Sequence, residues 1–390
     1  MTGSGILTGR RIILGVTGSI AAVETVRLAH ALRREGARVV AVMTPAARGI
    51  IHPDALCYAT GNEVITALTG RVEHVTWCGD DGSADLLLIA PCTANTIGKV
   101  AAGIDDTAVT TFASTALGRG MPVVVVPAMH HSMFRHPAVI ENIRRLESWG
   151  ITIVPPRIEE GKAKIALPED IVLWCERALS GRPLAGRRIL ITSGACREAV
   201  DDVRVLTTRS SGRMGRELAL QAFRLGAEVT VVQNGTTPCV ATIPVETAAE
   251  MRDAVHQSCE GHQPDLYISA AAISDYAPER HEGKLRSGRD ISLTLHPLPK
   301  LIDEIITRYR VPVVAFKLGE DEEDRGRDLL VRGASIVVVN GPAAMGSDTS
   351  DAVILTADQR EVVTGTKREL AERIWDHVLS HAPAWGWKTG

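Results

Sequence analysis

The sequence predicts an α/β protein built of two doubly wound, mostly parallel-sheet domains of the Rossmann-like class. Short apolar runs rich in Val, Ile and Leu alternate with longer stretches whose apolar residues recur at helical spacing. This alternation is typical of a parallel sheet covered by helices on both faces. The pattern lapses once, over residues 180–187 (SGRPLAGR), and then restarts. We therefore expect one domain over residues 1–182 and a second over residues 187–390.

The first half begins with a β-α-β unit. Residues 11–16 (RIILGV) form a β-rich run, and residues 20–34 carry apolar positions at helical spacing. Each later element is expected from the same two patterns. Further strands are expected at 38–42, 85–90, 122–126 and 151–154, and helices at 94–102 and 138–149.

The second half repeats this organisation after the Gly- and Pro-rich interruption. A strand at 188–192 leads through a long Gly/Ser loop to a helix at 214–225. The acidic run 319–328 (GEDEEDRGRD) is expected to begin a solvated helix and not to bind metal. Further strands are expected at 228–232, 265–269, 311–316 and 335–339.

Composition excludes several classes of protein. A formal net charge of -3 over 390 residues and an aromatic content of 4% disfavour a nucleic-acid partner. The longest apolar runs fall well short of the roughly 20 residues that cross a membrane. The N-terminal segment lacks the features of a secretory signal, and the seven cysteines form no C-x-x-C pair. We therefore expect a cytoplasmic protein with reduced thiols and no membrane contact.

Two turns of the first half contain groups that suit a phosphate. Residues 15–22 (GVTGSIAA) supply two glycines and the hydroxyls of Thr17 and Ser19, which suits a mononucleotide such as FMN better than a dinucleotide. Residues 90–96 (APCTANT) end a strand and open a helix, where open α/β sheets bind ligands. The alternatives are a tight turn that needs glycine and an ordinary N-cap.

Histidines suggest a base in the first half. His74 lies in VEHVTW and suits proton transfer near neutral pH, although a lone histidine is more often an ordinary surface or core residue. The segment 125–134 (VVPAMHHSMF) ends an apolar strand in two histidines and is expected at a pocket rim. A metal site at His131 and His136 lacks a third ligand, so no metal ligand is assigned.

The second half contains a stronger phosphate signal. Residues 207–215 (TTRSSGRMG) place hydroxyls, glycines and arginines at a helix N-terminus, which suits a triphosphate. Asp275 is the acidic residue of a small-residue turn after a strand, and it is expected either to contact a ligand or to cap a helix. Lys284 lies in the charged loop EGKLRSG, where a solvated surface lysine is the alternative.

In this order the motifs resemble the bifunctional coenzyme A biosynthesis family, in which phosphopantothenoylcysteine decarboxylase is fused to phosphopantothenate-cysteine ligase. GVTGSIAA, EHVTW, APCTANT and VPAMHHSMF match the decarboxylase half, and SSGRMG, SAAISDY, EGKL and AFKLGED match the ligase half. The variants PAMH and EEGKAK look like the archaeal branch. The resemblance covers nearly the whole chain.

The resemblance implies a flavodoxin-like flavoprotein domain at the N-terminus. His74 would be its catalytic histidine, and His130 and Met129 would bind the substrate. In the family, FMN oxidises the cysteinyl thiol to a thioaldehyde, from which the carboxylate is readily lost. The residues implied to hold FMN are Gly18, Ser19, Ile20, Thr44, Thr93, Ala94 and Asn95.

The resemblance also implies a C-terminal ligase domain that forms an acyl-nucleotide, which the cysteine amine then attacks. Lys284 would serve catalysis and the triphosphate, Thr208 would bind substrate, and Mg²⁺ would neutralise the phosphates. CTP is the expected co-substrate, with ATP possible because AFKLGED resembles ATP-using ligases. The residues implied to bind nucleotide are Ser210, Ser211, Gly212, Arg213, Ala270, Ala271, Asp275, Lys284, Phe316, Arg332 and Asn340.

Three positions depart from the pattern of many bacterial members. His130 and Thr208 stand where those proteins have asparagine, and residues 159–170 (EEGKAKIALPED) lack the cysteine that completes the reduction there. Lys162, Lys164 or His130 is then expected to contribute differently. Two alternatives stay open. One is a regulatory flavin-binding protein, which the missing cysteine favours, and the other is a flavin prenyltransferase-like enzyme, against which the ligase half argues.

The resemblance also implies the partners. These are small-molecule substrates, namely phosphopantothenate, cysteine and a nucleoside triphosphate. It further implies a homo-oligomer of trimeric flavin domains and dimeric ligase domains, plausibly a dodecamer. Sequence periodicity carries no information on this assembly.

Overall fold

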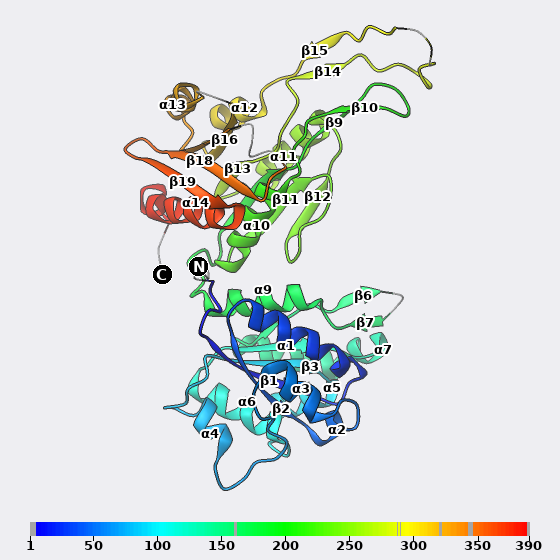
Figure 1. The fold of residues 1–390 in the computed structure, drawn as a ribbon, viewed down its shortest axis with the longest axis vertical. Helices are drawn as coiled ribbons and strands as arrows, with labels where there is room; N and C mark the ends of the chain where they lie inside the picture. Colours follow the sequence, from blue (N-terminus) through cyan, green and yellow to red (C-terminus); the bar gives the residue numbers. More distant parts are fainter. Residues whose placement is uncertain are drawn as a thin grey trace. The chain divides into compact units, whose positions relative to one another are not determined.

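The computed structural model describes residues 5–159, 162–286, 288, 290–319, 322–341 and 346–387, with the backbone alone at 158–159 and 162–163 (Figure 1). Contacts within the chain divide it into two compact units, Met1–Arg182 and Pro183–Gly390. Each unit contains its own sheet. Within the described residues, no helix has the length and apolar character needed to cross a membrane.

The first unit is a five-stranded parallel sheet in the order β2-β1-β3-β4-β5. This is the flavodoxin-like order, in which the chain reverses direction across the sheet between β1 and β3. The doubly wound class predicted from the sequence is confirmed. The strands are β1 (Arg11–Val16), β2 (Arg38–Met43), β3 (Leu86–Cys92), β4 (Val123–Pro127) and β5 (Thr152–Ile153).

Helices cover both faces of this sheet because alternate strand residues point to opposite sides. Ile12 and Leu14 pack in one core with α1 and α9, and Ile13 packs in the other with α5 and α6. The expected helix 20–34 begins with a 3-10 turn, η1 (Ile20–Glu24). The helices are α1 (Thr25–Arg34), α2 (Pro45–Arg48), α3 (Pro53–Thr60), α4 (Glu73–Cys78), α5 (Ala94–Ala102), α6 (Ala108–Arg119), α7 (His131–Phe134), α8 (Pro137–Ser148) and α9 (Pro168–Leu179), and a hairpin joins β6 (Arg157–Glu159) to β7 (Lys162–Lys164).

The second unit contains an eight-stranded sheet in the order β12-β11-β8-β13-β16-β17-β18-β19. Its first six strands are parallel and follow the order typical of dinucleotide-binding folds, with the reversal between β8 and β13. The antiparallel strands β18 and β19 were not expected from the sequence. The strands are β8 (Arg188–Ser193), β11 (Glu228–Gln233), β12 (Ala241–Pro244), β13 (Leu266–Ser269), β16 (Val313–Leu318), β17 (Ile336–Asn340), β18 (Thr349–Leu355) and β19 (Arg360–Thr366).

Helices again cover this sheet on both sides. The helices α10 (Arg213–Arg224) and α14 (Lys367–His381) pack against each other, and the buried Trp375 indole donates a hydrogen bond to the Leu218 carbonyl oxygen at 3.0 Å (Figure 1). The acidic run expected to begin a helix does so, because α13 begins at Glu323. The remaining helices are α11 (Ala248–Gly261), α12 (Leu301–Tyr309), α13 (Glu323–Arg332) and the short η3 (Ala382–Trp385).

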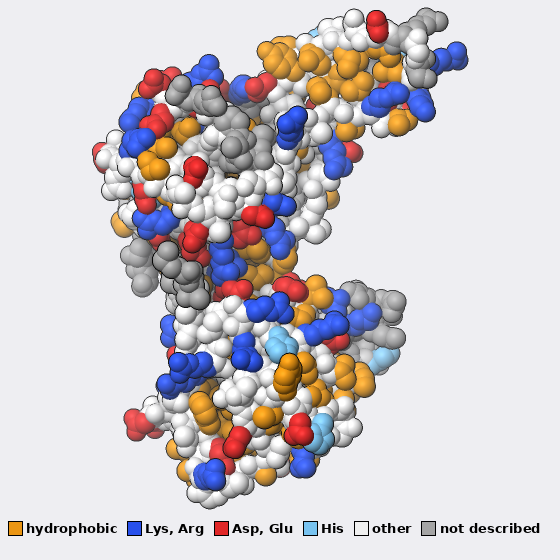
Figure 2. Space-filling model, viewed as in Figure 1, with side chains coloured by type: hydrophobic (Ala, Val, Ile, Leu, Met, Phe, Trp, Pro, Cys, Tyr) orange, Lys and Arg blue, Asp and Glu red, His pale blue; other side chains and the backbone are white. Residues whose placement is uncertain are grey.

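An arm made of two antiparallel ribbons extends from the second unit (Figure 1). One ribbon pairs β9 (Arg197–Ala199) with β10 (Val205–Thr207), and the other pairs β14 (Tyr276–Pro278) with β15 (Leu295–Pro297). Apolar side chains gather on its surface, as Figure 2 shows. The exposed apolar residues of the arm are Val203, Val205, Tyr276, Ile291, Leu293 and Leu295.

Asp201 joins the two ribbons of the arm. Its buried carboxylate accepts hydrogen bonds from the N–H groups of Val203 at 2.8 Å, Arg204 at 2.6 Å and Leu285 at 3.0 Å. Burial by itself raises the pKa of Asp201, but these donors and the Arg204 guanidinium outweigh it and hold the pKa well below its ordinary value. The charged carboxylate therefore stabilises the arm.

We expect Asp201→Asn to loosen the arm, because the amide places a donor against donors, at a local cost of about 2 kcal/mol. Hydrogen exchange over residues 276–297 should then speed up. In the wild type the same protection should be present above the ordinary pKa of about 3.9 and lost as the pH falls further, through the lowered folded pKa. Asp376→Asn is the control, because Asp376 is an exposed residue of α14, outside the arm, and is ion-paired with Arg373. Unchanged exchange in the Asp201 variant would contradict this account.

Candidate functional sites

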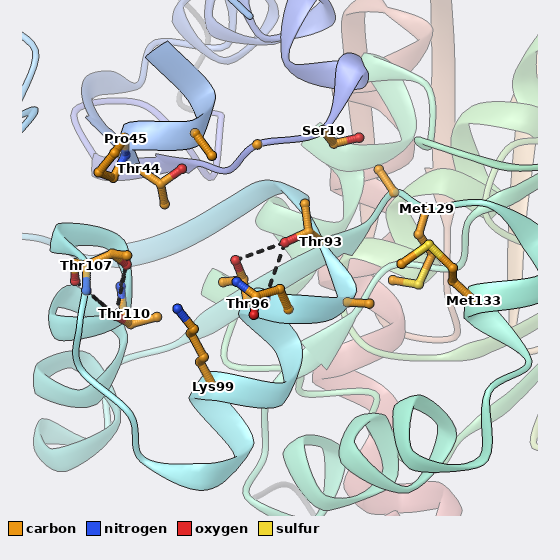
Figure 3. A pocket seen from close by; sticks show the side chains of 15 residues that line it. Ser19, Thr44, Pro45, Thr93, Thr96, Lys99, Thr107, Thr110, Met129 and Met133 are labelled. Atoms are coloured by element: carbon orange, nitrogen blue, oxygen red, sulfur yellow. Dashed lines mark hydrogen bonds between the residues drawn. The ribbon is translucent and has the colours of Figure 1, made fainter. Parts of the chain in front are cut away.

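The first unit has a cavity of about 540 Å³ at the carboxyl ends of its strands (Figure 3). The turns after β1, β2, β3 and β4 all open onto it, as expected where the strand order reverses. The lining residues are Gly18, Ser19, Thr44, Pro45, Ala46, Thr93, Ala94, Asn95, Thr96, Lys99, Thr107, Thr110, Ala128, Met129 and Met133. Six of the seven residues expected to hold FMN are among them.

Close packing of two turns shapes this cavity. A Cβ atom added at Gly18 would lie 2.5 Å from the Cβ atom of Ala46, on α2. The backbone of the β1 turn therefore approaches α2 to a distance that only glycine permits. Ser19, Thr44 and Thr93 are each the N-cap of the helix that follows, so the turns are ordered without a ligand. In APCTANT, Thr93 caps a helix and also lines the cavity, so the capping role does not exclude a ligand-binding role.

Thr17 fixes the β1 and β3 turns relative to each other. Its hydroxyl, 1% exposed, donates to the Pro91 carbonyl oxygen at 2.7 Å and accepts from the Thr93 N–H at 3.1 Å. We expected this hydroxyl to contact a phosphate. That expectation is wrong because the hydroxyl is buried and is bonded to the protein backbone as both donor and acceptor. Thr17 is therefore a positioning residue.

We expect Thr17→Val to keep the shape of the side chain but remove both hydrogen bonds. The Thr93 N–H then loses its acceptor, whereas the Pro91 carbonyl oxygen keeps the Thr17 N–H. This unpaired donor should lower the free energy of unfolding of this unit by about 1–3 kcal/mol. Affinity for FMN should also fall, because Thr93 loses its orientation. Urea unfolding and flavin titration measure the two effects. Thr111→Val on α6 is a control, since Thr111 bonds only the carbonyl oxygens of its own helix and of Asp105.

Lys99 supplies a positive charge to the cavity that sequence reasoning missed. Its ammonium lies 2.5 Å from the Asp106 carboxylate, and it points between the hydroxyls of Thr96 and Thr110 (Figure 3). Lys99 lies one turn beyond Asn95 on α5, so the i, i+4 spacing could have indicated it. Hydroxyls and an ammonium around a glycine-lined turn suit the phosphate and polar ring edge of a flavin mononucleotide.

Three expected residues lie outside this lining. Ile20 is 78% exposed, and His130 is exposed and caps α7 through its ring nitrogen, which accepts the Ser132 N–H at 3.3 Å. His74 lies on α4, which packs against α6, and its buried Nδ1 atom has no hydrogen-bond partner among the described residues. A single copy of this unit therefore does not bring His74 to the cavity.

The second unit has a cavity of about 430 Å³, also at the carboxyl ends of its parallel strands. It brings together segments that the motifs indicated, from Thr208 to Asn340 in the chain. From the expected set, the lining contains Thr208, Ser210, Ser211, Gly212, Arg213, Ala270, Ala271, Asp275, Phe316 and Asn340. Lys300, Gly346 and Lys367 also line the cavity and lie outside the quoted motifs, whereas Ser269 and Lys317 lie within the motifs at 269–276 and 315–321.

Small residues bring the loops of this cavity together. A Cβ atom at Gly215 would lie 2.6 Å from the Cβ atom of Ser193, and one at Gly212 would lie 3.2 Å from the Cα atom of Gly194. Gly212 also has a φ of +71°, which glycine adopts readily. The loop after β8 and the start of α10 thus form a narrow backbone cradle.

Polar groups in this cavity could bind a ligand. The Oδ1 atom of Asn340, at the end of β17, is buried without a hydrogen-bond partner among the described residues. The Asp275 carboxylate forms an ion pair with Lys300, so it does not cap a helix. A polar ligand in this open cavity could donate a hydrogen bond to the unpaired amide oxygen and could contact the charged pair.

Two expected residues lie outside the cavity. Lys284 is exposed on the arm, and Arg332 forms an ion pair with Asp303. No group of three or more His, Cys, Asp or Glu side chains suited to a metal occurs in the part of the chain that the structure describes. The protein residues there do not by themselves form a metal site.

Comparison with known proteins assigns both halves. Residues 3–179 match the Flavoprotein family model, and residues 184–381 match the model of the DNA/pantothenate metabolism flavoprotein C-terminal domain. The coenzyme A biosynthesis bifunctional protein CoaBC of Thermococcus kodakarensis is 43% identical over 95% of this chain and 95% of its own length. The chain belongs to the CoaBC family. The resemblance inferred from the motifs is thus confirmed.

Further CoaBC proteins are similar to this chain. The CoaBC protein of Methanocaldococcus jannaschii is 36% identical, over 97% of this chain and 95% of its own. The crystal structure of the C-terminal domain of a CoaBC protein is 29% identical and covers 52% of this chain and 99% of that one, with a TM-score of 0.44. Relatives of full length show that both halves of the family are present here.

The structure describes only part of the segment that lacks the expected cysteine. Residues 160–161 of EEGKAK lie outside the described residues, as does the side chain of Lys162, while Lys164 is half-buried in β7. Cys92 is next to the FMN cavity in sequence but is fully buried, and burial raises the pKa of its thiol. Cys92 therefore does not replace the missing thiol.

Proposed function

We propose that this CoaBC protein joins cysteine to phosphopantothenate through an acyl-nucleotide and then decarboxylates phosphopantothenoylcysteine with FMN to give phosphopantetheine. The observation that carries the proposal is that each half gathers most of its separate motifs around one cavity at the reversal point of its sheet. Ligands of open α/β sheets bind there. The first cavity is lined by hydroxyls, small residues and one lysine, and the second also contains an arginine, several lysines and a carboxylate.

The first cavity suits the decarboxylation. Gly18, Ser19, Thr44, Thr93, Ala94 and Asn95, with Lys99, would hold FMN. Bound FMN supplies the two-electron oxidation of the cysteinyl thiol and its reversal. Met129 lies at the rim and would contact the substrate, and His130 follows it directly. We propose that His74 accepts the thiol proton, as a base that works near neutral pH.

This role of His74 requires a second copy of the chain. His74 does not line the cavity of its own copy, whereas Val72 and Val75 beside it and Ile20 and Val23 beside the cavity are exposed apolar residues. We propose that copies associate so that α4 of one approaches the cavity of the next, as in the trimer implied by the family. The apolar arm of the second unit would pair ligase domains, giving up to a dodecamer. Light scattering measures the assembly.

The second cavity suits the ligation. The helix N-terminus at Gly212, with Ser210, Ser211 and Arg213, would bind the phosphates, and Asn340 and Thr208 would contact the remaining groups. We propose CTP as the nucleotide. Mg²⁺ would reach the site on the phosphates, because Asp275 is the one carboxylate among the described lining residues and is already paired. The reaction should therefore stop when a chelator removes the metal.

One reaction tests the whole proposal. Purified protein is incubated with phosphopantothenate, cysteine, Mg²⁺ and either CTP or ATP, and the products are followed by mass spectrometry. We expect phosphopantetheine with CTP, and its formation with ATP alone would contradict the nucleotide assignment. His74→Asn should accumulate phosphopantothenoylcysteine. Bound FMN without any product from the wild type would favour a regulatory flavin-binding protein.

The compartment is part of the proposal. Cys92 and Cys175 are fully buried free thiols, and such thiols persist in a reducing compartment. We propose the cytoplasm, where a soluble biosynthetic enzyme meets small-molecule substrates. Fractionation of cells followed by immunodetection checks this.

A further inference from the structure

A lysine that no motif indicated lines the ligase cavity. Lys367 is the first residue of α14, and only 8% of it is exposed. It shares the lining with Arg213 and with Ser210 and Ser211, although more than 150 residues separate it from them in the chain. Lysine is rarely buried to this extent unless its charge is paired. Because Lys367 lines the cavity, a bound ligand can add to the interactions that it makes within the protein.

The fold brings Lys367 to this position through the two antiparallel strands. Strand β19 ends at Thr366, whose hydroxyl accepts the Glu369 N–H at 3.2 Å, so α14 begins sharply at Lys367. The Lys367 N–H donates to the Asp348 carbonyl oxygen at 3.0 Å, which ties the helix start to the segment before β18. The helices α10 and α14 pack against each other, and the first residue of each, Arg213 and Lys367, lines the same cavity.

Positive charge is concentrated there. The Arg213 guanidinium is oriented by the Asp348 carboxylate at 2.7 Å and the Gly346 carbonyl oxygen at 2.9 Å. Burial lowers the pKa of Lys367, the nearby Arg213 lowers it further, and Asp348 opposes both. Two cations therefore lie at the starts of two helices and line one cavity. An anion bound between the cations would stabilise the charged lysine.

We propose that Lys367, together with Arg213, binds the β- and γ-phosphates of the nucleoside triphosphate, which leave as pyrophosphate. This inference rests on the proposed ligase function. A carboxylate oxygen of phosphopantothenate bonds to the α-phosphorus, and the bond from that phosphorus to the oxygen bridging the β-phosphate breaks. The electron pair stays on the departing pyrophosphate, and no proton is consumed. Two cations at the β- and γ-phosphates stabilise the charge that grows there.

The test compares ligands that contain or lack these phosphates. Isothermal titration calorimetry of the full-length protein measures binding of CTP, CMP and inorganic pyrophosphate to the wild type, K367M and K367R. We expect K367M to weaken CTP and pyrophosphate binding about 10- to 100-fold, the range of a charge-assisted hydrogen bond, with CMP binding unchanged. K367R should retain at least part of the affinity for CTP.

Arg368→Met is the matched control, because Arg368 is the next residue of α14, carries the same charge and is not among the residues that line the cavity. It should bind CTP like the wild type. Thermal unfolding in the absence of nucleotide and flavin content show whether each variant is folded. Equal CTP binding by folded K367M, or an equal loss of CMP and CTP binding, would overturn the inference. A wild type that binds no nucleotide would instead overturn the proposed ligase function.

Discussion

Replacing Gly18 with alanine should produce a folded protein that has lost its flavin. The added Cβ atom would lie 2.5 Å from that of Ala46, and neither turn has a flexible side chain that could move away. The β1 turn and α2 must then separate, at a strain of about 1–3 kcal/mol. Both line the FMN cavity, so affinity for FMN should fall about 10- to 100-fold.

Flavin absorbance and fluorescence titration measure this loss, and phosphopantothenoylcysteine should accumulate because the ligase cavity is unaffected. Gly118→Ala is the control. Gly118 lies in α6, and an added Cβ atom there would meet nothing within 4 Å, so this variant should keep its flavin and gain about 0.5–1 kcal/mol of stability. Wild-type flavin affinity in Gly18→Ala would contradict the proposed cradle.

Gly215→Ala should affect the other activity, so that ligation is lost and decarboxylation is kept. Alanine within a helix ordinarily stabilises it by about 0.5–1 kcal/mol relative to glycine. At Gly215 the new Cβ atom would lie 2.6 Å from the Cβ atom of Ser193 and 3.2 Å from its Cα atom. The start of α10 must therefore move away from the β8 loop, which displaces the phosphate-binding segment and should reduce ligase activity about 10- to 100-fold.

The measurement is nucleotide-dependent formation of phosphopantothenoylcysteine, with decarboxylation of added phosphopantothenoylcysteine as the internal reference. Gly261→Ala is the matched control in the same unit. Gly261 ends α11, where an added Cβ atom would meet nothing within 4 Å, so both activities should stay at the wild-type level. A Gly215→Ala variant with full ligase activity would show that the close approach to Ser193 is not required.

Strand and helix patterns identified most of the parallel elements. The helix expected at 94–102 is α5, Ala94–Ala102, and the strand expected at 11–16 is β1, Arg11–Val16. Buried parallel strands are continuous apolar runs, which a local pattern reveals. Strands β18 and β19 were missed because polar residues interrupt that pattern, as Asp351 and Glu361 illustrate. Each strand of the arm has only 3 residues, too few to show a pattern.

In the candidate sites, too, residues within a short motif were recognised and residues placed by helix packing were missed. Ser211 and Arg213 were recognised because their chemistry lies within one short segment, and Thr93 because it follows a strand directly. Lys99 and Lys367 were missed, since each lines a cavity through helix packing and not through a motif. His74 was recognised by resemblance, yet it does not line the cavity of its own copy.

The sequence by itself therefore determined the α/β class, the two-part organisation, the CoaBC family and the short segments that line the cavities. These follow from local periodicity and from motifs that act within a few residues. Only the tertiary structure decided that Thr17 faces Pro91, that Gly18 must accommodate Ala46 and that Lys367 joins Arg213. Such contacts link residues from 28 to more than 150 positions apart, and their energies depend on distances that chain packing sets and no local pattern records.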